Sequence, residues 1–149
     1  MEGKRAPFLL LLLFLVACHT PPFPPVDLAA PGWQTRTGQA IWKPDRLKPE
    51  IVGDLILSTD QNGNAYLEFS KAFPIVHARL MPDAWQIEFP PQNKRYAAPG
   101  PPPARISWLQ LLRIWTGAEI PKRWNASDRS ENGITLRNTK TGELIEAHF

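Results

Sequence analysis

The chain has 149 residues, enough for one domain, and carries 17 basic and 14 acidic residues for a formal net charge of +3. A surplus this small gives no support for a nucleic-acid partner, which would need a strongly basic surface. There is one cysteine, so an intramolecular disulfide is excluded, and we expect the folded part to be stable without one.

The first seventeen residues have the layout of a secretory signal. Lys4 and Arg5 form a short basic start, and an unbroken apolar run follows over residues 8–16. The run is much shorter than the roughly 20 residues that a helix needs to cross a bilayer core. A basic start, a short apolar run and then small residues are typical of a signal peptide. Residues 1–17 are therefore predicted to be removed and lie outside the expected fold.

The segment Leu15-Val16-Ala17-Cys18 resembles the lipobox of bacterial lipoproteins. The resemblance implies cleavage before Cys18, attachment of lipid to its thiol and acylation of the new amino group. The alternative is an ordinary signal peptide with Cys18 as a chance thiol, but an unpaired reactive thiol is a liability in an exported protein. Lipid of this kind anchors a protein to a membrane without spanning it. Because lipoproteins of the inner membrane typically carry Asp after the cysteine, His19 favours the outer membrane.

Residues 18–32 are predicted to be a lipidated tether. Four of the five residues 21–25 are proline, which favours an extended polyproline II spacer. A disordered tail of no special length is the alternative interpretation. Loss of Lys4, Arg5 and Glu2 with the signal lowers the formal charge by one, from +3 to +2. We expect the folded domain to span residues 33–149.

The first half of this domain reads as about five strands joined by short links. The expected strands are residues 33–42, 53–58, 65–69, 75–80 and 85–89. Asn62-Gly63 is a strong hairpin signal between the second and third. Trp85, Ile87 and Phe89 alternate with polar residues, as in a strand with one buried face. Short links between consecutive strands predict an antiparallel sheet.

The second half is predicted to hold one helix and a last hairpin. Residues 90–103 contain six prolines and read as a loop, and residues 121–132 as a polar connection. Between them, four apolar residues have helical spacing. They are Trp108, Leu111, Leu112 and Trp115. Ser107 with Gln110 fits a capping box. Residues 134–138 and 144–149 complete the hairpin.

These elements predict a mainly β fold with one α-helix, of the α+β class. A curved antiparallel sheet, or incomplete β-barrel, packed on the helix would bury the apolar face of both. The helix is too apolar to lie free on a surface, so we expect most of it to be covered.

A catalytic, metal or cofactor site is not expected. His19 lies in the tether, His148 is next to the last residue, and His77 lies within a strand pattern. His77 is interpreted as a strand residue that faces solvent or is satisfied in the core. There is no metal-ligand spacing, no glycine-rich phosphate loop and no context for a nucleophile. With Cys18 acylated, no thiolate remains to bind zinc.

Six tryptophans are many for a chain of this size, and they allow two interpretations. The first is ordinary core packing. The second is an apolar cavity between helix and sheet that accepts an acyl chain. In the second, the strand wall is Trp85, Ile87 and Phe89, and the helix wall is Trp108, Leu112 and Trp115.

Beyond the lipobox and tether, the segments GDLILS…GNAYLEFS and LLRIWTGAEIP make residues 33–149 similar to the LolA/LolB-like group of envelope proteins. That group has an incomplete antiparallel barrel closed by helices around an apolar cavity, and its best-known members carry lipoproteins to the outer membrane. The membrane-inserting member presents an apolar residue on a protruding loop. Here the hairpin tip at residues 60–64 is polar, and residues 72–75 are the nearby apolar substitute. The chain is also shorter, with fewer elements to close a barrel.

We therefore expect a membrane-anchored, periplasm-facing lipoprotein that is not an enzyme. Its expected partners are the membrane, through the lipid on Cys18, and a lipid or acylated protein bound in the apolar cavity. The expected location is the cell envelope, at the outer membrane. The alternative is a structural envelope lipoprotein that binds another protein and has no ligand cavity. Whether side chains fill the space between Trp85 and Trp115 separates these interpretations.

Overall fold

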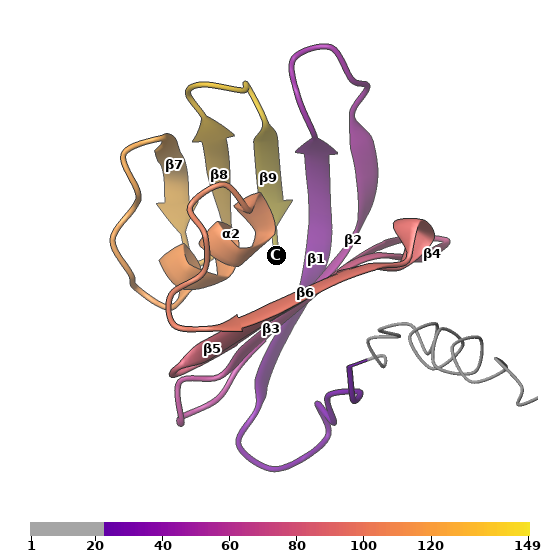
Figure 1. Ribbon diagram of the computed structural model, residues 1–149, viewed down its shortest axis with the longest axis vertical. Helices are drawn as coiled ribbons and strands as arrows, with labels where there is room; N and C mark the ends of the chain where they lie inside the picture. Colours follow the sequence, from indigo (N-terminus) through magenta and orange to yellow (C-terminus); the bar gives the residue numbers. More distant parts are fainter. Residues whose placement is uncertain (1–22) are drawn as a thin grey trace, which may run out of the picture.

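The structure is a computed structural model that describes residues 23–149. These residues form one nine-stranded antiparallel sheet and, within the described range, one α-helix (Figure 1). The elements are β1 (Gln34–Lys43), β2 (Ile51–Thr59), β3 (Ala65–Lys71), β4 (Phe73–Met81), β5 (Ala84–Phe89), the 3-10 turn η2 (Pro90–Gln92), β6 (Lys94–Pro99), α2 (Ser107–Trp115), β7 (Trp124–Ser130), β8 (Gly133–Asn138) and β9 (Leu144–His148). The predictions for the signal peptide and for Cys18 lie outside the described residues.

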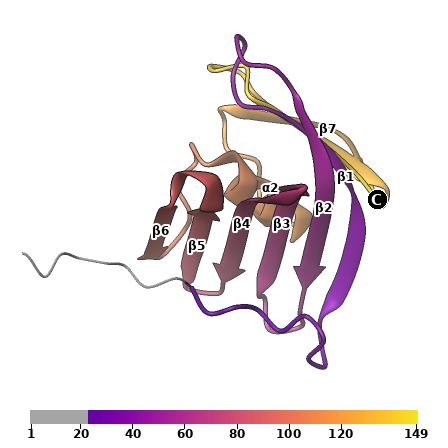
Figure 2. The ribbon, with the colours of Figure 1, turned by 90° about the vertical axis from the view of Figure 1, so that its right-hand side faces the viewer.

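The strands lie in the order β6-β5-β4-β3-β2-β1-β9-β8-β7, so the first strand joins the last three strands to the rest of the sheet. β1 pairs with β2 along almost its whole length and with β9 over Gln39–Lys43. Gly38 lies just before this second pairing, where a Cβ would collide with the carbonyl of His148. A glycine inside a strand often permits such a close approach. The sheet curves in this region, and α2 lies inside the angle between the two groups of strands (Figure 2).

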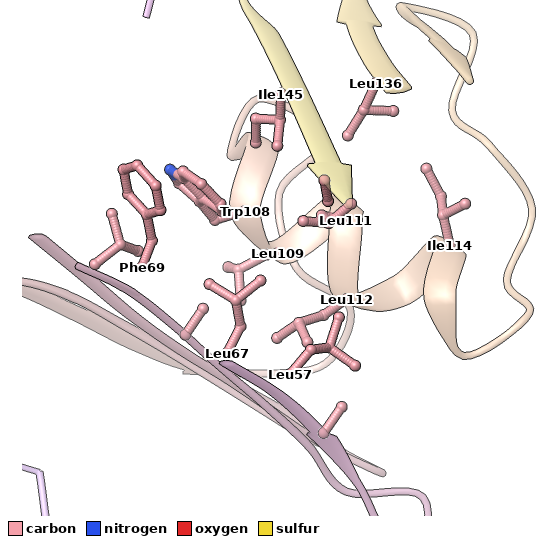
Figure 3. Packing of buried hydrophobic residues seen from close by; sticks show 14 of the residues in the cluster. Leu57, Leu67, Phe69, Trp108, Leu109, Leu111, Leu112, Ile114, Leu136 and Ile145 are labelled. Carbon is pink, nitrogen blue, oxygen red and sulfur yellow. The ribbon is translucent and has the colours of Figure 1, made fainter. Parts of the chain in front are cut away.

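The inner face of the sheet and nearly all of α2 form one apolar core. Figure 3 shows the helix side chains between Leu67 and Phe69 on one side and Leu136 and Ile145 on the other. The Trp108 ring stacks on Phe69 with centroids 4.9 Å apart. The prediction of a mainly β fold, with a curved antiparallel sheet packed on one helix, is confirmed for the described residues.

Two edge strands are absent from the prediction. β6 lies in the proline-rich stretch expected to be a loop, but its only proline is the last residue, Pro99, and an edge strand tolerates a missing amide donor. β7 lies in the expected polar connection and is mostly exposed, with a bulge between Ser127 and Ser130. Both predictions were wrong because an edge strand with little buried surface needs no apolar alternation.

The predicted capping box is also wrong, although the helix begins at the expected serine. Ile106 is the N-cap residue, and no side chain caps the helix. The Ser107 hydroxyl instead donates to Glu143, in the turn before β9. Gln110 is buried and donates through Nε2 to the carbonyl of Pro103, 3.0 Å away. Tertiary partners therefore take the polar groups that the local pattern assigned to the cap.

Glu143 ties the start of α2 to β1. One oxygen of its carboxylate accepts hydrogen bonds from Ser107 Oγ and, at 3.0 Å, from Trp42 Nε1. Burial raises the pKa of the Glu143 carboxyl above its ordinary value of 4.5, and the two hydrogen bonds offset only part of this rise.

Replacing Glu143 by glutamine should make the protein progressively more stable than wild type as the pH rises above 4.5, the ordinary value for this group. Because the folded pKa is raised, the folded state binds the proton more tightly than the unfolded chain. The contribution of Glu143 is therefore fully present below the unfolded pKa and is lost as the pH rises through the folded pKa. Glutamine keeps an oxygen acceptor for Ser107 and Trp42. Urea unfolding of both proteins at acidic and mildly alkaline pH measures the difference, and an equal difference at both contradicts this assignment.

Candidate functional site

The six side chains predicted to wall a cavity all belong to one cluster. Four lie in the core, and two are half-buried and pack against it. The core members are Trp85, Ile87, Trp108 and Leu112, and the half-buried members are Phe89 and Trp115. Trp115 packs on Phe149 with ring centroids 4.8 Å apart, beneath the Arg36 guanidinium. The six residues therefore share one core, although α2 packs mainly against β3, β4 and β8 rather than against β5.

These side chains surround no open space at the positions that would matter most for a ligand. Ile87 and Leu112 have no exposed surface, so not even a water molecule can touch them. The interpretation of the tryptophans as core packing describes this arrangement. An acyl chain could lie between helix and sheet only if α2 moved away from β3 and β4, and binding there stays a prediction.

The loop between β1 and β2 presents a leucine to solvent. Leu47 is 95% exposed, more than any other large apolar side chain among the described residues. The Asp45 carboxylate accepts hydrogen bonds from the amides of Leu47 and Lys48 at 2.8 and 3.0 Å, which orders the turn. The Arg46 side chain lies against Gly142 in the β8–β9 turn. Leu47 therefore projects from a loop held on both sides.

Two more exposed apolar side chains lie at the same end of the sheet. Phe73 is 59% exposed at the start of β4, and Val52 is 49% exposed near the start of β2. Because β2 begins where β3 ends, with Asp54 opposite Ser70, the β1–β2 loop and the β3–β4 turn share one end. We call Leu47, Val52 and Phe73 the apolar rim.

Sequence reasoning anticipated part of this rim. The structure exposes Phe73 in the stretch at residues 72–75, named as the apolar substitute for a polar hairpin tip. Leu47 was missed because one leucine among charged residues has no periodicity. The available signal was its place between Pro44 and Pro49, which mark residues 44–49 as a loop. An apolar residue in such a loop cannot be assigned to a core face.

On the outer face of β3–β5, a second group of side chains forms a polar network. The Tyr66 hydroxyl donates to Glu68 at 3.1 Å, and Arg95 Nε donates to Glu88 at 2.8 Å. His77 lies between the two carboxylates, with Nε2 3.5 Å from Glu68 and Nδ1 4.0 Å from Glu88. The residue predicted to be a strand histidine is therefore on β4, beside two acids.

This network lacks the hydrogen-bond arrangement of a nucleophilic catalytic site, in which a hydroxyl donates to a base. Its hydroxyl belongs to Tyr66 and donates to Glu68, not to His77. Burial, and next the negative charge of Glu68, raise the pKa of the Tyr66 phenol well above its ordinary range, so it stays protonated. Nucleophilic catalysis needs a hydroxyl that passes its proton to a base held by a third group. The arrangement is better described as a polar network in which Tyr66 and Arg95 satisfy the two carboxylates, while His77 Nε2 is buried without a hydrogen-bond partner among the described residues.

No protein-family model matches the chain, and no curated protein sequence matches it significantly. Within residues 23–149, no group of three or more His, Cys, Asp or Glu residues is placed to hold a metal ion. In the same part of the chain, no helix has the length and apolar character needed to cross a membrane.

Proposed function

We propose that this protein is a lipid-anchored, non-enzymatic lipoprotein of the cell envelope whose folded domain meets lipid through the apolar rim. The observation that carries the proposal is Leu47, 95% exposed on an ordered loop at the end of the sheet where Phe73 and Val52 are also exposed. Burying a large aliphatic side chain is worth about 1.5–3 kcal/mol. Exposed apolar groups gathered at one end of a domain mark contact sites for membranes or other proteins.

Charges around Leu47 suit a bilayer surface that contains anionic lipid. Lys43, Arg46 and Lys48 flank it, against Asp45 and Glu50. Basic residues near a membrane surface contribute about 1 kcal/mol each where the leaflet is anionic. The exposed pair between Lys48 and Asp45, at 3.9 Å, holds one of these charges only weakly. The loop therefore combines an apolar tip with a modest basic surplus.

The resemblance to the LolA/LolB-like group supports a more specific form of the proposal. A curved open sheet around a buried helix is the coarse architecture that the resemblance implies. Leu47 would correspond to the apolar residue that the membrane-inserting member presents on a protruding loop. In this form the protein receives or releases a lipid or an acylated protein at the outer membrane, to which the lipid on Cys18 holds it.

Leu47→Glu should weaken binding of the unlipidated protein to vesicles that contain anionic lipid. Loss of about 1.5–3 kcal/mol of leucine burial corresponds to roughly ten- to hundred-fold weaker partitioning. The background carries Cys18→Ser so that the anchor does not mask this contact, and flotation measures the bound fraction. Ile120→Glu is the matched control, because it places the same charge on another exposed apolar residue. Equal binding of the wild-type loop and Leu47→Glu would remove the support for this function.

A second candidate function is binding of another protein, with no lipid ligand. The filled core around Ile87 and Leu112 favours it, because a solid domain has only its surface to offer. A fluorescent fatty acid titrated into the purified protein separates the two. Saturable binding that a Leu112→Trp substitution blocks would support lipid carriage between helix and sheet. A lack of saturable binding would favour the surface-binding alternative.

A further inference from the structure

The described chain begins against the outer face of the sheet, on the side opposite α2. Residues Phe23–Val26 border a cleft of about 380 Å³ whose floor is formed by β3, β4 and β5. The floor side chains are Tyr66, Glu68, His77, Ala78, Arg79, Gln86 and Glu88. We call Phe23–Val26 the strap.

Burial along the strap matches an extended segment docked by one side. Phe23 and Val26 are half-buried, whereas Pro24 and Pro25 are exposed. Polyproline II has three residues per turn, so positions 23 and 26 point the same way. The two residues that face the domain are thus the apolar pair, and the prolines between them keep the segment extended.

The floor suits such a segment. The rings of Tyr66 and His77 lie 6.3 Å apart and give the cleft two flat aromatic surfaces. Extended proline-rich segments are commonly recognised by grooves that aromatic side chains line. Glu88 is held by Arg95, and Glu68 accepts the Tyr66 hydroxyl. An apolar strap therefore meets a floor whose carboxylates already have partners.

We propose that docking of the strap sets how the anchored domain faces its membrane. This inference rests on the proposed function in one respect, the lipid on Cys18. With the strap docked, the five steps from Cys18 to Phe23 reach at most about 18 Å. With the strap released, the sixteen steps from Cys18 to Gln34 reach about 50 Å as polyproline II. The docked strap holds the outer face of β3–β5 toward the bilayer.

The apolar rim lies away from this docking site. The cleft floor is level with Ile56, which pairs with Glu68, which in turn pairs with His77. The first residue of β2, Ile51, lies five residues further along the strand, about 17 Å, and Leu47 lies beyond it. Release of the strap frees the domain to turn the rim toward lipid, and docking limits that freedom.

Energy transfer in the lipidated full-length protein tests the orientation. Because the thioether blocks Cys18, one added cysteine can carry a donor dye, and acceptor lipid is included in phosphatidylcholine vesicles. Ala97→Cys reports on the docking face, since Ala97 is exposed and pairs with Gln86. Lys140→Cys reports on the rim end, since Lys140 lies in the turn whose Gly142 contacts the β1–β2 loop.

We expect stronger transfer from position 97 than from position 140, and loss of that difference when Phe23→Ser and Val26→Ser are combined. The matched control combines Ala29→Ser with Pro31→Ser, two exposed positions that lie between the strap and β1. The control should keep the difference. Equal transfer from both donors in wild type overturns the proposal, as does a difference that survives in the strap variant or is lost in the control.

Docking is also measured without the anchor, so that failure of the anchor and failure of the strap remain distinct. In two-dimensional NMR spectra of the Cys18→Ser protein, the strap variant should shift the amides of Tyr66, His77 and Gln86, and the control should not. If these amides do not shift, the strap does not dock on the sheet, whether or not Cys18 carries lipid. Shifted amides, with no transfer because the lipidated preparation stays off vesicles, support docking and reject the anchor.

Discussion

Replacing Cys18 by serine is expected to release the protein from the membrane completely. The proposed thioether to lipid would need the cysteine sulfur, and acyl chains supply about 0.8 kcal/mol of membrane affinity per buried CH₂. Fractionation of cells that express each form measures the loss, and mass spectrometry of the amino-terminal peptide reports the lipid mass on wild type.

Substitution at the next residue is the control for this result. His19→Ala leaves the thiol and the preceding residues unchanged, so the protein should stay in the membrane fraction with the same lipid mass. His19→Asp should move it to the inner membrane, as the lipoprotein resemblance implies. Wild-type protein that retains residues 1–17 and a free Cys18 thiol would overturn the anchor itself.

Trp108→Ala should lower the free energy of unfolding by about 3–5 kcal/mol, the cost of removing a large aromatic ring from a packed core. The Trp108 side chain is buried, stacks on Phe69 at 4.9 Å and meets Trp42 edge-on at 5.6 Å. It joins α2 to β3 and β1, so its loss weakens the contact between helix and sheet. Urea unfolding followed by circular dichroism measures the change. A loss below about 1 kcal/mol would show that the core is not packed as described.

Trp108→Phe separates the ring from its indole nitrogen. Trp108 Nε1 is buried and has no hydrogen-bond partner within residues 23–149, and a buried unsatisfied donor costs about 1–3 kcal/mol. Phenylalanine removes that donor and keeps an aromatic ring against Phe69. We therefore expect Trp108→Phe to be clearly more stable than Trp108→Ala. Equal destabilisation by both would mean that the aromatic packing against Phe69 does not supply the stability assigned to it.

The strands that the sequence predicts are those with one buried face. Residues 65–69 and 85–89 alternate because their inner side chains enter the core, and the Asn62-Gly63 turn lies between β2 and β3 as expected. β6 and β7 escaped prediction because both lie at the edges of the sheet. Edge strands bury little, so their hydrogen bonds depend on a neighbouring strand and leave no pattern in their own residues.

For the candidate site, the sequence predicts that the side chains are buried but not whether they enclose a cavity. The apolar character of Trp85, Trp108 and Leu112 predicts that they are buried, and they are. The same character cannot separate a filled core from a lined cavity, because both need apolar side chains on facing elements. Only packing density separates the two, and it depends on how closely α2 approaches the sheet.

By itself, the amino-acid sequence determined the mainly β class, the antiparallel pairing of consecutive strands and the position of the buried helix, because local periodicity and turn residues encode them. It also supports the predicted anchor at Cys18, which depends on a linear motif. Only the tertiary structure decided that β1 pairs with β9, that helix and sheet pack without space at Ile87 and Leu112, and that Leu47 and Phe73 share one end. The physical reason is that these features depend on contacts between residues far apart in the chain, and local sequence patterns do not encode such contacts.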